Sequence, residues 1–441
     1  MIEPSDTVRG MTAPVRVGLL GCGVVGAATA RILTEHASEL LTRTGAPIEL
    51  ARVAVRDPSK DRGLTLSREV WTTDAAAVVT DPSIDVVVEV IGGIEPARSL
   101  ILDAIAHKKH VVTANKELLS SQGRELMTAA EGNSVDLLFE ASVGGGIPII
   151  RPIRESLAGD RVRRVMGIVN GTTNFILTRM SEMGESFEEA LEHAVRLGYA
   201  ELDPTADVAG HDAAAKIAIL ASLAFDARVV ASDVHTQGIQ DVTRADIAAA
   251  HQLGYEVKLL AIAEMDAGMI SARVYPAMLP KTHPLASVRD VFNAVFIEGE
   301  QSGEIMFLGR GAGGRPTAAA VVGDIVEIAR NVALGARSPG YVGFHADAHL
   351  RANDDTQARY YIVLSVADRP GVLSEVAGVF AQHGVSIASV RQEGSGREAT
   401  LMLITHRAPE GKHHATLAEL RALADVHSVE ATMRVEGTEE G

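Results

Sequence analysis

The chain has 441 residues, enough for about three domains, and its 46% hydrophobic and 22% charged residues are typical of a folded globular protein and exclude a disordered one. Its 57 acidic and 41 basic side chains leave a formal charge of −16, which disfavours nucleic acid or an anionic membrane as the main partner. The single cysteine, Cys22, excludes an intramolecular disulfide and makes a zinc site built from thiolates implausible.

The N-terminus and the apolar runs favour a cytoplasmic protein. Residues 1–10 are polar and begin with acidic side chains, unlike a secretory signal, and suggest a disordered leader or an upstream start codon. The best apolar candidate, residues 217–225, is flanked by Lys216 and Asp226 and is far shorter than the ~18 residues of a membrane span.

The first region alternates strands with helices. We expect a helix from the glycine-rich segment 21–26 to about Leu41, and strands at residues 15–20, 49–55, 84–90, 110–113 and 135–139. Strands separated by segments of helical length indicate parallel βαβ units, so the region predicts a doubly wound, Rossmann-type α/β sheet.

A Gly-x-Gly-x-x-Gly motif joins the first strand to the first helix, which is the context of a dinucleotide-binding turn. Gly21 permits the tight turn, Gly23 lets the backbone approach a pyrophosphate, and Gly26 allows close packing of the helix. The alternative is a glycine-rich turn without a ligand. The residues expected at the cofactor, from this motif and from the end of the strand at 84–90, are Gly21, Gly23, Val24, Val25, Gly26 and Gly92.

The end of the second strand favours NADP(H) over NAD(H). Arg56 follows the strand and Lys60 lies a short turn away, so two cations converge on the extra phosphate of NADP. Asp57 is the kind of residue that binds the ribose of NAD, so NAD(H) stays open. A solvated surface position for Arg56 is the other alternative.

Lys116 is a candidate for chemistry at the carboxyl end of the sheet, where ligands of doubly wound sheets bind. It follows the strand at 110–113 by three residues. A lysine there stabilises a developing alkoxide or holds a carboxylate. An ordinary surface lysine fits the same pattern.

The middle region, about residues 150–320, mixes helices with strands such as 163–170 and 291–298. It closes with a glycine cluster at 309–314, and a further helix is expected at 317–333.

Four carboxylates stand within twelve residues of this region, at Glu201, Asp203, Asp207 and Asp212. Asp212 and Lys216 lie four apart on an alanine-rich helix expected at 212–225, so they share one face and can pair. A charge on such a helix is costly unless it is paired or used. The alternatives are a surface salt bridge and a solvated acidic loop.

The last region predicts the order strand, helix, strand, strand, helix, strand, which is the ferredoxin-like arrangement. It follows a linker at 338–358, and a Gly-Ser-Gly hairpin loop separates its middle strands. We expect His413-His414 in an exposed polar loop. The expected strands are 360–366, 385–392, 400–405 and 429–435, and the helices are 372–383 and 415–424.

Motifs along nearly the whole chain resemble the homoserine dehydrogenase family. GCGVVG, VVTANK, FEASVGGGIPII, NGTTNFIL, GYAELDPTADVAGHDAAAK and FLGRGAGGRPTA are similar to that family's blocks and stand in the family's order. The tail, with Asp368-x-Pro370-Gly371, resembles an ACT domain, a regulatory module that often binds amino acids. The aspartate kinase domain of some relatives is not in this sequence, so the chain resembles the monofunctional form.

The resemblance implies reversible reduction of L-aspartate 4-semialdehyde to L-homoserine by NAD(P)H, in the biosynthesis of threonine, methionine and isoleucine. Lys216 would be the proton donor, ordered by Asp212, and Lys116 would lie close to substrate and cofactor. Glu201 would hold the substrate's ammonium group. The other expected substrate contacts are Gly198, Asp207, Asp212 and Thr173, although a helix-capping role for Thr172 or Thr173 is the alternative.

The resemblance also implies a monovalent cation site for sodium. Its ligands would be the Glu140 carboxylate and the backbone carbonyls of Val143, Gly145 and Ile147, which are hard oxygen donors. Gly313 would contact the cofactor through its backbone.

The predicted organisation is a dinucleotide-binding domain at residues 11–150 completed by about 316–340, an α+β substrate-binding and dimerisation domain at 151–315, a linker at 341–357 and an ACT domain at 358–437. We expect feedback inhibition by L-threonine at the ACT domain, in a homodimer or homotetramer. Truncation after Ala352 is expected to leave activity and abolish threonine sensitivity. A tail used only for oligomer contacts is the alternative.

Other functions stay open. A different Rossmann dehydrogenase with a regulatory tail, such as a phosphoglycerate dehydrogenase, would rely on a His–Glu pair and on arginines for its anionic substrate, and the carboxylate-rich loop before Lys216 speaks against it. An inactive amino-acid sensor conflicts with the intact Lys116, Asp212 and Lys216. A purely structural dinucleotide is a weaker alternative.

Overall fold

The computed structural model describes residues 13–394 and 398–437, so the expected leader at 1–10 and most of the Gly-Ser-Gly loop lie outside the described residues. The chain forms two compact units. Within the described residues, the first unit comprises 13–161, 218–231 and 307–347, and the second comprises 162–217, 232–306 and 348–437.

The first unit is a doubly wound parallel sheet with the strand order β3-β2-β1-β4-β5-β6, as the sequence predicts. The strands are β1 (Val15–Leu20), β2 (Ile48–Ala54), β3 (Trp71–Thr72), β4 (Val86–Glu89), β5 (His110–Thr113) and β6 (Leu137–Leu138). The residues of β4 are all buried, which is expected for strands covered by helices on both faces.

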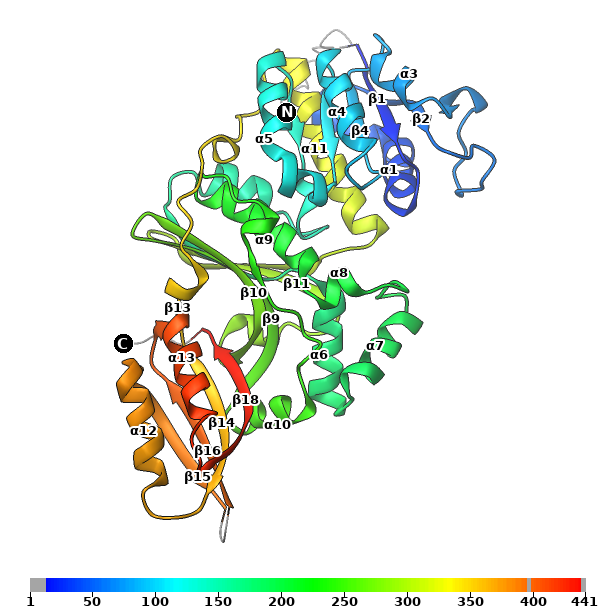
Figure 1. Ribbon diagram of the computed structural model, residues 1–441. Coiled ribbons are helices and arrows are strands. Elements are labelled where there is room, and N and C mark those ends of the chain that lie inside the picture. The colour runs from blue at the N-terminus through cyan, green and yellow to red at the C-terminus, as the bar shows by residue number, and fades with distance from the viewer. Residues whose placement is uncertain (1–12, 395–397, 438–441) are drawn as a thin grey trace, which may run out of the picture. The chain divides into compact units, whose positions relative to one another are not determined.

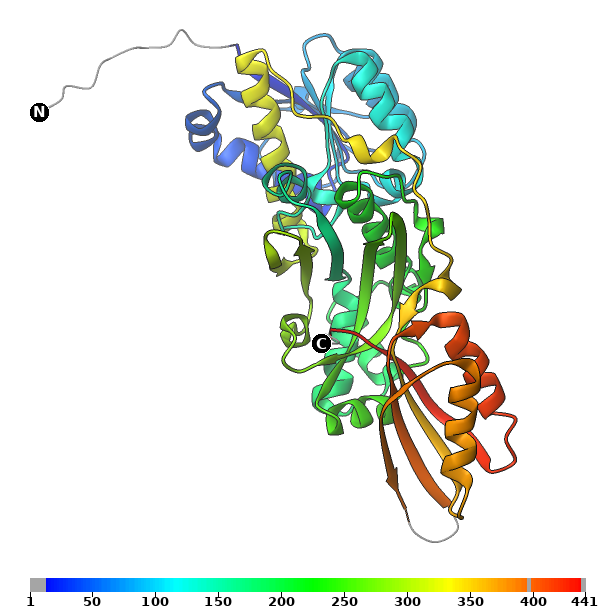
Figure 2. The ribbon, with the colours of Figure 1, turned by 90° about the vertical axis from the view of Figure 1, so that its left-hand side faces the viewer.

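The helices of this unit lie on the two faces of that sheet. Those on one face are α1 (Val24–Glu35), α2 (Ala37–Thr44) and α11 (Gly314–Leu334), and those on the other are α3 (Ala75–Thr80), α4 (Ala97–Ala106) and α5 (Lys116–Asn133). Figure 2 shows the blue α1 and the yellow α11 on one side of the sheet and cyan helices on the other. The helix expected to reach Leu41 breaks at His36, which separates α1 from α2.

The second unit is built on one mixed sheet with the strand order β12-β11-β7-β9-β10-β18-β14-β16-β15, and β8 pairs with β10. The first group of its strands is β7 (Val162–Ile168), β8 (His235–Thr236), β9 (Tyr255–Asp266), β10 (Met269–Pro280), β11 (Phe292–Gly299) and β12 (Gly303–Arg310), whose last residues belong to the first unit. The helices with them are α6 (Gly171–Met183), α7 (Phe187–Arg196), α8 (Thr205–Val208), α10 (Arg244–Gln252) and α9 (His211–Ala224), whose residues from 218 onwards belong to the first unit. The long pair β9 and β10 was not predicted (Figure 1).

The C-terminal part has the predicted ferredoxin-like order, with β18-β14-β16-β15 side by side. Its elements are β14 (Tyr360–Ala367), α12 (Val372–His383), β15 (Ile387–Glu393), β16 (Glu398–Thr405), α13 (Glu410–Leu420) and β18 (Val426–Val435). Both helices pack on the same face of these strands, as Figure 2 shows in orange and red. The core between them is apolar, and Ile362, Leu364, Val376, Phe380 and Leu403 are at most 1% exposed.

This part joins the sheet of the rest of the unit. β18 pairs in parallel with β10, with Arg434 opposite Ala277 and Val435 opposite Met278. The last strand of the ferredoxin-like arrangement is therefore also a strand of the larger sheet.

Two segments differ from their expected character. The expected linker contains Tyr341 and Phe344, which are buried and whose rings lie 4.5 and 5.9 Å from the Phe139 ring. The expectation of an exposed His413 is wrong, because α13 begins at Glu410 and His413 is fully buried beside the Ala358 carbonyl oxygen, 3.0 Å from Nε2. None of the described helices is long and apolar enough to span a membrane.

Candidate active site

The glycine turn between β1 and α1 has the shape of an anion-binding turn. A methyl group on Gly26 would lie 2.2 Å from the Gly21 carbonyl oxygen, so only glycine lets the helix approach the turn this closely. Gly23 faces open space, with no heavy atom within 4 Å of where a side chain would begin. Among the described residues no side chain caps α1, so the N–H groups of its first turn are available to an anion. This turn contains the exposed Val24 and the half-buried Val25. The turn fits the pyrophosphate of a dinucleotide.

A second helix N-terminus lies beside the first. Gly313, with φ 110°, precedes α11, and no side chain in the part of the chain that the structure describes caps this helix. A methyl group on Gly314 would lie 2.7 Å from the Val24 side chain and 2.9 Å from the Val24 carbonyl oxygen, so the two helix N-termini are in contact. Gly313 is therefore within reach of a ligand on the glycine turn.

Arg56 and Lys60 follow β2, as predicted, and both are exposed. Neither side chain makes a hydrogen bond or ion pair with another residue in the part of the chain that the structure describes. The Asp57 carboxylate instead accepts hydrogen bonds from the hydroxyl and the backbone N–H of Ser59, at 2.6 and 2.8 Å, and these bonds hold its pKa below the usual value. The two cations are thus available to a ligand, whereas Oδ1 of the carboxylate is already used in the turn.

Arg62, which the sequence reasoning missed, ties this loop to the glycine turn. Its Nε donates to the Cys22 carbonyl oxygen at 3.0 Å, and its guanidinium lies 5.4 Å from the centre of the Trp71 ring. No local pattern reveals this contact, because Arg62 and Cys22 are forty residues apart.

A buried carboxylate, also missed, organises the carboxyl ends of β4 and β5. Glu89 is fully buried, and its Oε1 accepts from the backbone N–H groups of Ile91 and Gly92 at 2.7 and 3.0 Å. Its Oε2 accepts from the Thr113 hydroxyl at 2.6 Å. Glu89 thereby fixes Gly92, a predicted cofactor contact, at the end of its strand.

The next turn holds Lys116 in place. Asn115 caps α5 by accepting from the Leu118 N–H at 3.1 Å, and its Nδ2 donates to the Gly93 carbonyl oxygen at 2.6 Å. Lys116 is the first residue of α5 and is half-buried. It stands where the sequence predicted it, at the carboxyl end of the parallel sheet.

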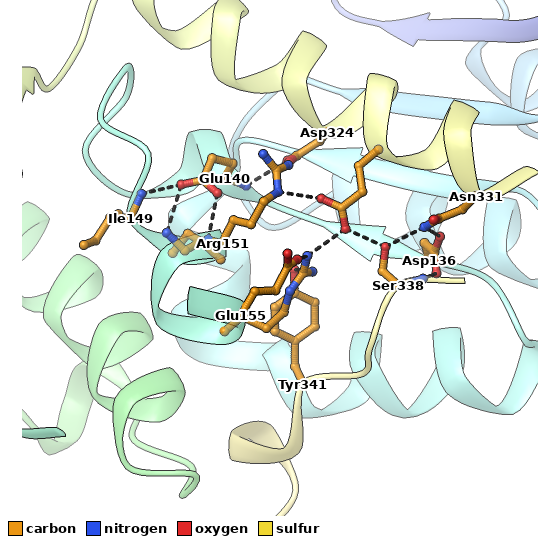
Figure 3. Close-up of polar contacts among 12 residues, drawn as sticks. Asp136, Glu140, Ile149, Arg151, Glu155, Asp324, Asn331, Ser338 and Tyr341 are labelled. Atoms are coloured by element: carbon orange, nitrogen blue, oxygen red, sulfur yellow. Dashed lines mark hydrogen bonds and ion pairs between the residues drawn. The ribbon is translucent and has the colours of Figure 1, made fainter. Parts of the chain in front are cut away.

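The predicted cation loop is built around Glu140, which is 4% exposed. Its carboxylate accepts from the backbone N–H groups of Ile149, Ile150 and Arg151 at 2.6 to 2.9 Å, as the dashed lines in Figure 3 show. Three of its four lone-pair directions are therefore used, and one on Oε2 remains.

The carbonyl oxygens of Val143, Gly145 and Ile147 accept no hydrogen bond from any described residue. These carbonyl oxygens and the Glu140 carboxylate are hard oxygen donors, the ligand type that suits a monovalent cation. No group of three or more His, Cys, Asp or Glu side chains gathers as a metal site within the described residues.

A buried ionic network supports this loop (Figure 3). Asp324 of α11 is 2% exposed and accepts from the Glu140 N–H at 2.8 Å and from Arg151 at 2.9 Å. Burial, followed by the nearby charge of Glu140, raises the pKa of Asp324 well above its usual value. Arg151 also pairs with Glu327 at 2.6 Å, which in turn accepts from Ser338. Sequence patterns gave no sign of this network because the contacts that join Glu140 and Arg151 to α11 connect residues more than 170 positions apart.

Asp212 and Lys216 form the predicted pair on α9. The Lys216 Nζ lies 2.6 Å from Asp212 Oδ2 and 2.7 Å from the Val169 carbonyl oxygen. Both side chains are about nine-tenths buried, with 11% and 9% of their surface exposed for Lys216 and Asp212. The pair is therefore not a surface salt bridge, and the ammonium group is held in a fixed position.

Asn170, which the sequence reasoning missed, joins this pair to Asp207. Its Nδ2 donates to Asp207 Oδ1 at 2.7 Å and to Asp212 Oδ2 at 2.9 Å. Its Oδ1 caps α6 by accepting from the Thr173 N–H at 2.8 Å. One amide group thus orients two carboxylates, and the predicted substrate residue Thr173 is buried behind it, with its hydroxyl 3.0 Å from Asn170 Oδ1.

The other predicted substrate residues lie at the surface of the same unit. Glu201 and Gly198 are exposed in the loop between α7 and α8, and Asp207 is half-buried. The structure thus groups the cofactor, cation and Lys116 positions in the first unit, and Asp207, Asp212, Lys216, Glu201, Gly198 and Thr173 in the second.

The turn that resembles an ACT effector loop borders a cavity of about 360 Å³. Arg369 beside it pairs with Asp425 at 3.0 Å, and Gln392 lies 3.4 Å from Asp368. The cavity has room for a small amino acid.

Comparison with known proteins covers nearly the whole chain. Family models match in three segments: the NAD-binding domain of homoserine dehydrogenase at residues 21–140, homoserine dehydrogenase at residues 148–326 and the ACT domain at residues 360–425.

The chain is similar to whole homoserine dehydrogenases. It is 48% identical over 433 residues to the enzyme of Corynebacterium glutamicum, covering 97% of each chain. The structure of a homoserine dehydrogenase from Thiobacillus denitrificans has 40% sequence identity and a TM-score of 0.91, covering 97% of this chain and 99% of that one. A hyperthermophilic archaeal homoserine dehydrogenase in complex with NADPH has 28% identity and a TM-score of 0.63, covering 74% of this chain and 99% of that one.

Proposed function

This chain belongs to the homoserine dehydrogenase family, and from that premise we propose which of its residues carry the reaction and its regulation. It is an NAD(P)-dependent homoserine dehydrogenase with a C-terminal ACT domain, which interconverts L-aspartate 4-semialdehyde and L-homoserine. The roles below rest on one observation above the others, the buried Lys216 ammonium held between Asp212 and the Val169 carbonyl oxygen.

Lys216 is the proton donor and acceptor for the substrate oxygen. When bound, the nicotinamide dinucleotide supplies or removes the hydride. As the carbonyl carbon is reduced, negative charge grows on its oxygen and a proton must reach it, which a positioned ammonium group provides. Asp212 and Val169 orient Lys216 for that transfer, and Lys116 stabilises the same developing charge.

The carboxylates hold the amino-acid part of the substrate. Asp207 is fixed by Asn170 and Glu201 lies in the exposed loop nearby, so both are available to accept from an ammonium group. Thr173 acts from behind, through Asn170, and Gly198 shapes the loop at the end of α7.

NADP(H) is the preferred cofactor, since Arg56 and Lys60 are uncommitted cations at the end of β2 while Asp57 is engaged by Ser59. Sodium is the cation held by Glu140, Val143, Gly145 and Ile147. It would order this loop by binding the carbonyl oxygens of the loop residues.

L-threonine is the effector of the ACT domain, bound at the turn with Asp368. The cavity size and the resemblance of this turn support the assignment. A homodimer or homotetramer and a cytoplasmic location stay predictions.

The test is oxidation of L-homoserine by NADP⁺ and by NAD⁺ at alkaline pH, followed by the absorbance of the reduced nicotinamide. Lys216→Ala should lower kcat by about a hundredfold or more, because a positioned acid–base group contributes roughly 10²–10⁴-fold, while dinucleotide binding stays intact. The exposed Lys412→Ala on α13 serves as the matched control and should turn over normally. Wild-type turnover by Lys216→Ala would refute the assignment, and a wild-type protein that binds both ligands without turnover would favour the sensor.

A further inference from the structure

Arg434, on the last strand of the ACT domain, is a buried arginine whose side chain is fixed by an ion pair and by two aromatic rings. Its side chain is 8% exposed, and its Nε donates to Glu410 Oε1 at 2.6 Å. Its guanidinium lies 4.4 Å from the centre of the Tyr275 ring and 5.4 Å from that of the Tyr360 ring. Stacking and ion pairing together fix the position of this cation.

Another nitrogen of this guanidinium, Nη1, contacts the segment after β8 in the same unit. Nη1 donates to Gln237 Oε1 at 2.8 Å. Gln237 follows β8, and its backbone N–H donates to the Val274 carbonyl oxygen of β10 at 2.8 Å. Gln237 is exposed, but Arg434 fixes its side chain and β10 fixes its main chain.

The two residues after Gln237 form the support of the short helix α8, which carries Asp207. The Ile239 N–H donates to the Val208 carbonyl oxygen at 2.9 Å. A methyl group on Gly238 would lie 2.2 Å from that same oxygen and 2.7 Å from the Ala209 Cα, so the two backbones touch. A shift of the segment 237–239 is therefore transmitted directly to α8.

Asp207 is connected to the reacting lysine by the contacts already described. Asn170 donates to both Asp207 and Asp212, and Asp212 holds the Lys216 ammonium. A continuous series of contacts, each at hydrogen-bond or van der Waals distance, leads from Arg434 to Lys216 within one compact unit.

We propose that Arg434 and Gln237 are positioning residues for the catalytic carboxylates, and that the last strand of the ACT domain is part of the support of the active site. The proposal rests on the roles given to Asp207, Asp212 and Lys216 above. It predicts that loosening the Arg434–Gln237 bond changes the kinetics of homoserine and leaves those of the dinucleotide unchanged, because the glycine turn and Arg56 take no part in these contacts.

The experiment is a double-mutant cycle with Gln237→Ala, Arg434→Lys and the two combined. Gln237→Ala should lower kcat/KM for homoserine roughly three- to tenfold, with a raised KM and an altered pH profile of kcat, whereas the KM for NADP⁺ stays within twofold. The combined variant should lose no more than the worse single variant, since the two residues act through one bond. Gln237→Glu keeps an acceptor for Arg434 and should restore wild-type values.

The exposed Gln252→Ala on α10 is the matched control and should match the wild type in every constant. A merely structural role would lower the fraction of active enzyme and leave KM and the pH profile unchanged. Wild-type kinetic constants for Gln237→Ala, or losses that multiply in the combined variant, would overturn the proposal. If the Arg434→Lys variant does not fold, the kinetic constants of Gln237→Ala alone decide. Failure of the catalytic assignment would instead appear as a fully active Lys216→Ala.

Discussion

Substitution of Asn170 separates the positioning of Asp207 and Asp212, the proposed active-site carboxylates, from the stability of the fold. Asn170 is 5% exposed and makes two kinds of contact. Its Nδ2 donates to Asp207 and Asp212, and its Oδ1 caps α6. Serine is as good a helix N-cap as asparagine but has no amide donor. Alanine has neither an acceptor for the cap nor an amide donor.

The expected size of the effect follows from these contacts. Hydrogen bonds to charged groups contribute about 1.5–3 kcal/mol each, and about 1.4 kcal/mol changes a rate tenfold. Losing the equivalent of one of these two bonds should therefore lower kcat/KM for homoserine by about ten- to a hundredfold in Asn170→Ser and in Asn170→Ala alike. Only Asn170→Ala should also lose the cap, which costs about 1 kcal/mol of unfolding free energy.

The assay is initial-rate oxidation of homoserine at saturating NADP⁺, with denaturant unfolding of the same preparations. The KM for NADP⁺ is the internal control, because Asn170 belongs to the second unit and the glycine turn to the first. If Asn170→Ser folds and retains wild-type kcat/KM, the amide does not position the carboxylates. If Asn170→Ser and Asn170→Ala are equally stable, the Oδ1 cap of α6 does not contribute to the free energy of unfolding.

Three further substitutions test other parts of the structure. Arg56→Ala should raise the KM for NADPH about tenfold, the loss of one charge-assisted contact, and the KM for NADH less than twofold; equal changes would mean that Arg56 does not bind the extra phosphate. Gly26→Ala brings a methyl group to 2.2 Å from the Gly21 carbonyl oxygen and should weaken dinucleotide binding more than tenfold in a fluorescence titration, so unchanged binding would contradict the role of the turn. Burial alone would raise the pKa of Glu264, but the charge of Arg273 lowers this pKa to about 2. The ionised Glu264 therefore adds roughly 3 kcal/mol at most to the free energy of unfolding. This contribution is complete above the pKa of the unfolded state and is lost as the pH falls towards 2. Glu264→Gln should accordingly lower the denaturation midpoint at pH 7 and have little effect near pH 2, and an equal effect at both pH values would exclude the ion pair as the cause.

The sequence predicted features that depend on neighbours along the chain. The glycine turn and β5 lie where expected, because a Gly-x-Gly-x-x-Gly turn and a short apolar strand are local patterns. Asp212 and Lys216 were paired correctly for the same reason, since four residues are one helical turn. That the pair is buried is a property of the packing around α9, which the spacing alone left open.

The supporting residues could not be predicted in this way. Asn170 contacts carboxylates 37 and 42 residues away, and Glu89 and Asp324 are buried by contacts that exist only in the folded chain. β9 was missed because residues 259–263 are continuously apolar and show no alternation of polar and apolar side chains, while the polar Glu256 and Lys258 are themselves buried. His413 was placed at the surface because it stands among polar residues, whereas the start of α13 at Glu410 turns it inward.

The structure also changes how regulation should be tested, because the ACT domain cannot be removed without damaging the larger sheet. Glu436, just after β18, is 5% exposed and accepts from Tyr275 at 2.6 Å, and it forms an ion pair with the buried Arg164. Truncation after Ala352 would remove this carboxylate from the buried Arg164 and Arg273 and leave them, among the described residues, only Glu298 and Glu264 as ion-pair partners, and breaking a buried ion pair costs about 3–5 kcal/mol. A truncated chain that loses activity would therefore report on stability and not on threonine. A substitution at the proposed effector turn, such as Asp368→Ala, removes only the proposed ligand contact and leaves the residues that pair β18 with β10 in place. Loss of threonine inhibition in that variant, with wild-type kcat, is the result that separates regulation from support of the active site.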